Sequence, residues 1–430
     1  MNKIEGNVIR FAEKNRAVLF FGIISLLAFY IRFAGFDYVS GDMSAFLIPW
    51  FNQIRDGGGI VSLKSQIGNY NILYQTLIAF LTYFKIDCVW LYKLLSVVFD
   101  YLLAFFAADF VGEMCGFKRF TFKHNLVYTV ILMLPTVFLN SGFWGQCDSI
   151  YCFFLLMTLY RFYKEKYISA FVFFGLALGC KFQAAFLAPF IVIYYFYKKR
   201  FTILGFFLSF TVFLSTGIFG YIFGRSLVEP IQIYLTQSGT YKDMYKNVYS
   251  FWCLVAKQGE TNWEYLHTAA MVLTLTICGL ALYTVMSGII KINTAEKFLG
   301  VAAWSFWALV YFLPEMHERY TYMVDILLVL LTFVSRKYLK YALLSCTLST
   351  MTYGRYLFGM GTFETWFAAL YLAAFVWFTY EFLRDNSERK KACVNAAGGE
   401  EPSQNPEDPS EVHCANTDEK VGVFHITGEN

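Results

Sequence analysis

The chain has 430 residues, of which 57% are hydrophobic, 20% are aromatic and only 15% are charged. Soluble proteins carry about 25% charged residues, so this composition excludes an ordinary soluble domain and predicts an all-α, polytopic integral membrane protein. The net charge of +4 needs no nucleic-acid partner to explain it, because cytoplasmic loops of membrane proteins are rich in Lys and Arg. The ten cysteines include no CxxC pair, so we expect no disulfide framework, no metal site and no other cofactor.

The chain begins with a basic stretch, 1–16, which carries Lys3, Arg10, Lys14 and Arg16. The apolar run that follows, 17–35, is long enough to cross a bilayer as a helix, and no signal-peptide cleavage site follows it. Because basic residues flank spans on the cytoplasmic side, we expect the amino terminus inside the cell. The long polar segment 36–70 should then lie outside.

The next apolar segment, 71–84, is short for a span, which needs about 20 residues. If it crossed the membrane, the basic loop 118–123 would face outward, against the positive-inside rule. We therefore expect an amphipathic helix on the outer membrane surface over 71–84, and a second span over 88–112. A similar surface helix is expected after Asp42, with an apolar stripe at Met43, Phe46, Trp50 and Ile54.

The remaining apolar runs give a model of about 12 spans, with the basic loops between them on the inside. The expected spans are 17–35, 88–112, 124–140, 149–163, 167–180, 182–197, 201–224, 265–290, 298–313, 320–334, 338–353 and 361–383. Together they define a transmembrane domain over 17–384. The tail, 385–430, is rich in Glu, Pro, Asn and Ser and has no apolar periodicity, so we expect it to be disordered and cytoplasmic.

Polar and ionisable side chains gather on the outer side of this model, although they come from separate segments. These segments are FDYVSGDMSAFLIPW (36–50), GNYN (68–71), NSGFWGQCDSIY (140–151), Lys181, residues 236–252 and LPEMHERYTY (313–322). A channel or transporter places its charges near the middle of the bilayer. Charges collected at one rim favour an enzyme that meets a lipid-linked substrate at the membrane surface.

The order of these motifs resembles the GT-C superfamily of glycosyltransferases, which use polyprenyl-phosphate sugars. The motifs are an acidic outer loop with Asp37 and Asp42, FWGQCDSIY, Lys-Phe-Gln at Lys181, NVYSFW and MHERY. Within the superfamily the chain is similar to bacterial mannosyltransferases related to the second mannosyltransferase of GPI-anchor assembly. The resemblance covers roughly residues 17–335, and Ser250 stands in NVYSFW where the family pattern has Asn.

The resemblance implies a GT-C fold and the transfer of a hexose, such as mannose or glucose, with inversion at the anomeric carbon and without a metal ion. The donor would be a polyprenyl-phosphate sugar, and the acceptor a glycan, a lipid or a protein. The active site would face the outer side of a cell membrane in which both termini are cytoplasmic. The alternative function is a transporter or flippase for lipid-linked sugars, which would need no catalytic base.

An inverting transfer needs a carboxylate that takes the proton of the acceptor hydroxyl. Asp42 is the candidate base and Asp37 the second choice. The alternative role for Asp42 is a helix N-cap for the segment that starts at Met43.

The departing lipid phosphate needs cations and hydrogen-bond donors. Arg319 offers a two-pronged fork and His317 a further donor, while Lys181 could assist or could be an ordinary lysine at the end of a span. A solvated interfacial turn is the alternative for the whole MHERY motif. Glu315 and Glu318 would repel phosphate, so we expect both to point away.

The sugar itself calls for a flat apolar face beside hydrogen-bonding groups. Trp144 and Asp148 fit this description, although Asp148 could equally anchor its loop. Gln146 and Tyr70 complete the expected substrate-binding set. Lys93 and Asp100 lie two turns apart on the same face of one expected span. There we expect an internal ion pair or hydrogen bond that holds helices together, and the alternative is a functional role for these buried ionisable groups.

Overall fold

The computed structural model describes residues 3–237, 242–257 and 262–397, and most of them are helical. The first half of the chain forms α1 (Lys3–Lys14), α2 (Arg16–Phe33), the π-helical turn η1 (Met43–Leu47), α3 (Ile48–Asp56), the 3₁₀ turn η2 (Gly59–Lys64), α4 (Ile72–Leu81), α5 (Cys88–Cys115), α6 (Phe122–Leu132), α7 (Pro135–Phe138), the π-helical turn η3 (Leu139–Trp144), α8 (Asp148–Tyr163), α9 (Tyr167–Cys180), η4 (Phe182–Leu187) and α10 (Ala188–Lys198).

The second half contains α11 (Leu204–Ser215), α12 (Ile218–Ile222), α13 (Glu229–Gln237), β1 (Tyr245–Lys246), η5 (Phe251–Leu254), α14 (Trp263–Met286), α15 (Ala295–Phe312), β2 (Met316–His317), α16 (Tyr322–Val334), η6 (Arg336–Tyr338), α17 (Leu339–Phe358) and α18 (Trp366–Ala397). The two strands are two residues each and pair in parallel, with Tyr245 opposite Met316 and Lys246 opposite His317. They join two stretches of loop that lie far apart in the sequence.

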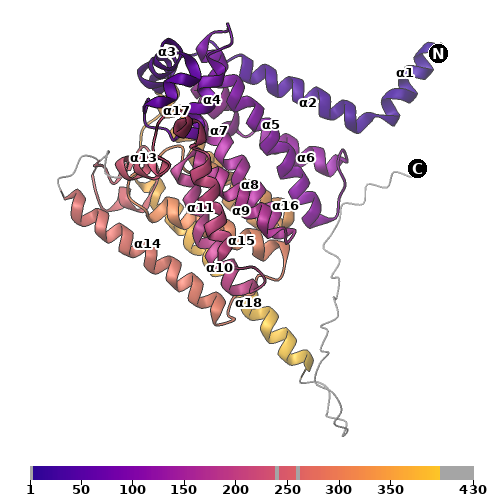
Figure 1. The fold of residues 1–430 in the computed structure, drawn as a ribbon. Helices are drawn as coiled ribbons and strands as arrows, with labels where there is room; N and C mark the ends of the chain where they lie inside the picture. The colour runs from indigo at the N-terminus through magenta and orange to yellow at the C-terminus, as the bar shows by residue number, and fades with distance from the viewer. Residues whose placement is uncertain (1–2, 238–241, 258–261, 398–430) are drawn as a thin grey trace.

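The helices form one body around α5, α8 and α16, and α1 and α2 extend from it as an arm (Figure 1). Helix α8 packs between α5 and α9, and α16 packs between α15 and α17. The central helices are apolar on all sides because every face meets another helix, as in α16, whose ten residues from Tyr322 to Leu331 are all buried.

Among the described residues, four helices are long and apolar enough to cross a membrane: α2, α5, α14 and the Trp366–Arg384 part of α18. A fifth span is possible if α6 and the α7–η3 segment, which meet at a 55° bend, cross together. Helices occupy every position where a span was expected, but most of the others are shorter or more polar. The α-helix α9, for example, has 14 residues and is about 21 Å long, against a hydrocarbon core of about 30 Å.

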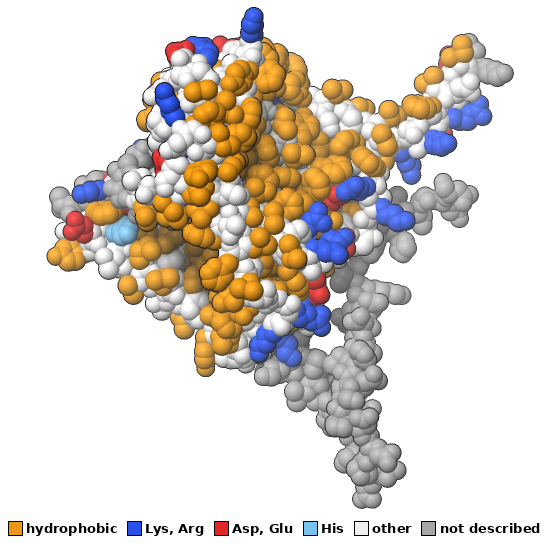
Figure 2. Space-filling model, viewed as in Figure 1, with side chains coloured by type: hydrophobic (Ala, Val, Ile, Leu, Met, Phe, Trp, Pro, Cys, Tyr) orange, Lys and Arg blue, Asp and Glu red, His pale blue; other side chains and the backbone are white. Residues whose placement is uncertain are grey.

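The long peripheral helices expose their apolar side chains, as membrane-facing helices do. Only 11% of the apolar window of α2 and 17% of that of α14 are buried, against 56% for the central α5. Hydrophobic side chains cover most of the visible face of the body (Figure 2). Since water would disfavour so much exposed apolar surface, the helical body is suited to a membrane.

Three expectations about local structure need correction. Lys93 and Asp100 are buried and hold neighbouring segments together, as expected, but they do not pair with each other: the Lys93 ammonium donates to the carbonyl oxygens of Gly35 (2.7 Å) and Phe36 (3.1 Å), whereas Asp100 accepts from Arg32 at 2.8 Å. Each charge takes the partner that a neighbouring segment brings within reach, because a buried charge without one is costly.

The second correction concerns the carboxyl-terminal tail, which was expected to lose structure from residue 385. Helix α18 continues to Ala397, and the rest of the expected tail lies outside the described residues. The third concerns the apolar stripe after Asp42. Met43 and Ile54 are fully or almost fully buried against the body, whereas Phe46 is 43% exposed, so this stripe mainly packs on protein.

The segment 71–84 is helical over α4, as expected, and Asn71 caps its start by accepting from the amide of Ile72 at 2.8 Å. The helix packs on α3, η2 and α9 and buries Tyr74 and Ile78. It is therefore an integral part of the body, and its position at a membrane surface stays a prediction.

Candidate active site

Asp42 lies at the start of the π-helical turn η1, and its side chain does not cap that turn. Ser40 does so instead, since its hydroxyl accepts from the amide of Met43 at 3.2 Å. The N-cap role considered for Asp42 is therefore wrong. Its carboxylate is left to face the polar interior, where the side chain keeps 23% of its surface exposed.

Three side chains from two other segments hold the Asp42 carboxylate. The indole nitrogen of Trp144 and the amide nitrogen of Gln146 both donate to Oδ2 at 2.9 Å, and the hydroxyl of Tyr356 donates to Oδ1 at 2.5 Å. Because three donors fix a carboxylate more firmly than one, Asp42 is positioned by the protein while still reachable from outside.

The segment before α8 approaches η1 closely, and Gly145 makes this possible. Gly145 has a φ of +75°, and a Cβ there would collide with the side chain of Met43. Only glycine adopts this conformation without strain and leaves the required space. The turn then delivers Gln146 and Asp148 to the same side as Asp42.

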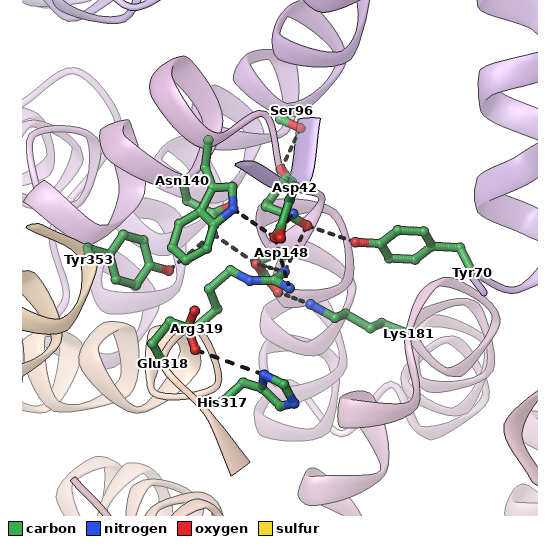
Figure 3. Close-up of polar contacts among 12 residues, drawn as sticks. Asp42, Tyr70, Ser96, Asn140, Asp148, Lys181, His317, Glu318, Arg319 and Tyr353 are labelled. Carbon is green, nitrogen blue, oxygen red and sulfur yellow. Dashed lines mark hydrogen bonds and ion pairs between the residues drawn. The ribbon is translucent and has the colours of Figure 1, made fainter. Parts of the chain in front are cut away.

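Asp148 lies in the first turn of α8, where the helix dipole favours negative charge. It is fully buried and accepts from three donors: Lys181 on Oδ1, and Arg319 Nη1 (3.2 Å) and Asn140 Nδ2 (2.8 Å) on Oδ2. Figure 3 shows Lys181 and Arg319 converging on this one carboxylate. With both oxygens occupied, Asp148 fits the anchor role better than the sugar contact.

Arg319 connects the two aspartates. The β1–β2 pairing places the MHERY segment across the site, and Arg319 Nη1 donates to Gln146 Oε1 at 2.8 Å as well as to Asp148. Its Nη2 lies 3.9 Å from Asp42 Oδ2. Arg319 Nε is buried without a hydrogen-bond partner among the described residues, so the guanidinium still has donor capacity.

Gln146 and Tyr70 belong to the same network, as expected. The Tyr70 hydroxyl donates to Gln146 Oε1 at 2.7 Å. The Gln146 side chain therefore accepts from Tyr70 and Arg319 while it donates to Asp42. We call the connected set of Asp42, Tyr70, Gln146, Asp148, Lys181 and Arg319 the carboxylate cluster.

Two residues of the expected site are placed differently. Trp144 is fully buried: one ring face stacks on Tyr356 at 4.2 Å, and Arg319 lies over the ring at 5.2 Å. It positions Asp42 and has no free face for a sugar. Asp37 is exposed and accepts from the indole of Trp90 at 3.0 Å, and no hydrogen bond or ion pair among the described residues links it to the carboxylate cluster.

Glu318 does not point away from the site, contrary to expectation. It is only 4% exposed and lies beside Arg319 and His317 (Figure 3). Its Oε2 is 3.9 Å from His317 Nδ1 and has no hydrogen-bond partner among the described residues. Burial raises the pKa of Glu318 to about 7 and lowers the pKa of His317 to about 3. At neutral pH the imidazole is therefore uncharged, and the two side chains do not form an ion pair.

Sequence reasoning did not identify several residues that complete the site. Tyr356 and Tyr353 lie in an apolar helix and read as packing residues, although Tyr356 binds Asp42 and the Tyr353 hydroxyl accepts from Asn140 at 3.1 Å. A signal was present for Asn140, because it opens the polar motif that contains Asp148.

The comparisons with known proteins add no assignment: no family model matches the chain, and no curated protein matches it. The chemical content of the site is thus the basis for its interpretation. It holds one partly exposed carboxylate, one buried carboxylate and two cations, with a buried carboxyl of raised pKa beside them. Such a set can accept a proton at Asp42 and bind an anionic group at Arg319.

Proposed function

We propose that the chain is an inverting membrane glycosyltransferase of the GT-C type. In this proposal about 12 helices cross the membrane, both termini are cytoplasmic, and the carboxylate cluster opens to the outer side. The enzyme moves a hexose from a polyprenyl-phosphate donor to a hydroxyl of a glycan, lipid or protein acceptor. The observation that carries the proposal is the Asp42 carboxylate, partly exposed, held by three donors and 3.9 Å from Arg319.

The proposed reaction assigns a step to each part of the cluster. Asp42 takes the proton of the acceptor hydroxyl, and the acceptor oxygen forms a bond to the anomeric carbon. The bond from that carbon to the phosphate oxygen breaks, and the polyprenyl phosphate leaves with the electron pair. Arg319 stabilises the charge that develops on the phosphate, since its Nε and Nη2 still have donor capacity.

Asp148 and Lys181 act as positioning residues in this scheme. The Asp148 carboxylate holds the Arg319 guanidinium and the Lys181 ammonium on one side of the site. It also offsets one of the two positive charges, which lowers the cost of holding two buried cations together. The arrangement leaves a net positive group for the phosphate next to the base.

Asp42→Asn separates this proposal from the transporter alternative. The amide keeps the shape of the carboxylate but cannot accept a proton, so transfer should fall by about 10²- to 10⁴-fold. Purified protein in nanodiscs would be given a panel of polyprenyl-phosphate hexoses, with release of polyprenyl phosphate and donor affinity measured separately. Donor affinity should change little.

The matched control is Asp56→Asn, in the same outer segment, whose side chain is 71% exposed and pairs with its neighbour Arg55. It should transfer at the rate of the unmodified protein. Full turnover by Asp42→Asn would remove Asp42 as the base. Translocation of donor lipid that persists in Asp42→Asn, without any transfer by the unmodified protein, would favour the flippase.

A further inference from the structure

A second polar site lies at the opposite end of α5, where a tight turn joins α5 to α6. Residue 109 is 16 positions beyond Lys93, which places it about 24 Å along the helix from the active-site end. Gly116 ends α5 with a φ of +74°, and Thr121 caps α6. The turn encloses a groove of about 530 Å³ lined by Asp109, Gly112, Glu113, Gly116, Phe117, Lys118, Arg119, His124 and Tyr160. We call it the hairpin groove.

Both acidic side chains of the hairpin groove are already paired. Asp109 accepts from Arg119 Nε at 2.8 Å and from Nη2 at 2.5 Å, and His124 Nε2 is 3.3 Å from its Oδ1. Glu113 accepts from Lys164 at 2.9 Å. The negative charges are therefore neutralised within the protein.

Positive charge remains at the mouth of the groove. Lys118 and Lys123 are exposed, and neither forms an ion pair among the described residues. Figure 2 shows Lys and Arg gathering at the right-hand margin of the body, beside the apolar surface. The rings of Phe120 (40%) and Phe122 (73%), in the turn that carries these lysines, are exposed as well.

His124 points to a ligand rather than to a solvated basic turn. It is 1% exposed and lines the groove, and its Nδ1 has no hydrogen-bond partner in the part of the chain that the structure describes. Its Nε2 is held by the Asp109 carboxylate, so one polar atom at the base of the groove stays unsatisfied. The guanidinium of Arg119 and the ammonium of Lys118, both in the lining of the groove, match the oxygens of a phosphate.

We propose that the hairpin groove binds a phosphate group, with Arg119 and Lys118 in its lining and Lys123, exposed in the next turn of the chain, adding positive charge nearby. The same chemistry is offered by the phosphodiester of an anionic lipid and by free phosphate. A lipid is the better fit, because the apolar rings next to the basic mouth would contact acyl chains while the groove holds the headgroup. This site is independent of the proposed glycosyl transfer.

The test is lipid binding by the full chain in nanodiscs of phosphatidylcholine with increasing phosphatidylglycerol, read by native mass spectrometry. Each lysine should contribute about a fivefold gain in affinity, so Lys118→Gln/Lys123→Gln should bind roughly 25-fold more weakly. Inorganic phosphate is titrated as a competitor. Strong competition would identify free phosphate as the ligand, and weak competition would identify the lipid.

The control is Lys166→Gln/Lys199→Gln, which removes two exposed lysines from the adjoining basic loops. It should bind as the unmodified protein does. His124→Gln is measured together with its melting temperature, so that misfolding is recognised. Equal loss in both double variants, or saturable binding by neither phosphatidylglycerol nor phosphate, would overturn the proposal.

Discussion

The carboxylate cluster and the hairpin groove use similar side chains, an aspartate held by two cationic or imidazole groups, but in opposite environments. Asp148 and Asp109 are both buried, but Arg319, the partner of Asp148, has 14% of its side chain exposed, whereas Arg119, the partner of Asp109, has 57% exposed. The cluster draws on five stretches of chain, and the groove on one helical hairpin and its neighbours. In the carboxylate cluster, long-range contacts and a low dielectric make each substitution costly in stability. In the hairpin groove, water and salt screen the charges, so substitutions cost less.

The two regions should lie on opposite sides of the membrane. In a Cys88→Ser background, a cysteine placed at exposed Lys64 should react with a membrane-impermeant maleimide in intact cells. The native Cys115, exposed near the groove, should react only after permeabilisation. If Cys115 reacts in intact cells, the proposed topology is wrong and both regions face the same side.

Removing the buried carboxylate of Asp148 should destabilise the protein far more than removing the half-exposed carboxylate of Glu113. Asp148→Ala leaves Lys181 and Arg319 without their shared carboxylate, at a cost of about 3 to 5 kcal/mol. Glu113→Ala breaks a half-exposed pair and should cost about 0 to 1 kcal/mol. Denaturation in detergent by both variants measures the difference, and equal losses would mean that the cluster is as well solvated as the groove.

The buried carboxyl of Glu318 should make stability depend on pH in a way that no group of the hairpin groove does. Its pKa is raised to about 7 in the folded protein from an ordinary value of 4.5, so the folded state holds an extra proton between these values. Stability should therefore fall as pH rises through this window, by about 3 kcal/mol in all.

Glu318→Gln isolates that contribution. The charged and titratable groups near Glu318 are Arg319, Asp42, Lys246 and His317. The lowered pKa of His317, about 3, acts in the opposite direction, because stability from a neutral buried imidazole is lost as pH falls below 6.5. The stability difference between the unmodified protein and the variant should grow from pH 5 to pH 8, and a constant difference would place Glu318 in solvent.

The smallest of these effects is expected for a substitution that keeps charge and alters shape. Arg319→Lys retains one positive charge but cannot bridge Gln146 and Asp148 while still reaching toward Asp42, so donor affinity should fall by about tenfold. Arg319→Ala should be weaker still, and His317→Ala should affect turnover more than binding. Titration with a polyprenyl-phosphate hexose measures donor affinity across the series. An unchanged affinity in Arg319→Lys would mean that only the positive charge at position 319, and not the shape of the guanidinium, contributes to donor binding.

Much of the helical framework could be predicted because apolar run lengths and turn residues act locally. Runs such as 88–112 and 167–180 gave helices close to α5 and α9, since a helix satisfies its own backbone hydrogen bonds within the segment. The end of α18 was missed because the loss of apolar periodicity after residue 384 marks the end of a buried face, and a helix can continue without one.

The membership of the site was only partly predictable. The motifs indicated Asp42, Gln146, Asp148, Lys181, Arg319 and Tyr70, because polar groups in an apolar chain have to gather where they can be satisfied. Their partners could not be read in the same way: Tyr356, which donates to Asp42, lies outside all the polar motifs, and nothing local marks a tyrosine that will donate to a carboxylate.

The sequence by itself determined the class of molecule, the positions of its helices and the set of polar motifs that had to find one another. The tertiary structure decided the pairing. Asp100 pairs with Arg32, and Lys93 donates to backbone carbonyls. The indole of Trp144 donates to Asp42 instead of offering a face to a sugar, and Glu318 is buried. The physical reason is that a buried charge is stabilised by whichever partner the packed helices bring within about 3 Å, and that distance depends on contacts between segments far apart in the chain.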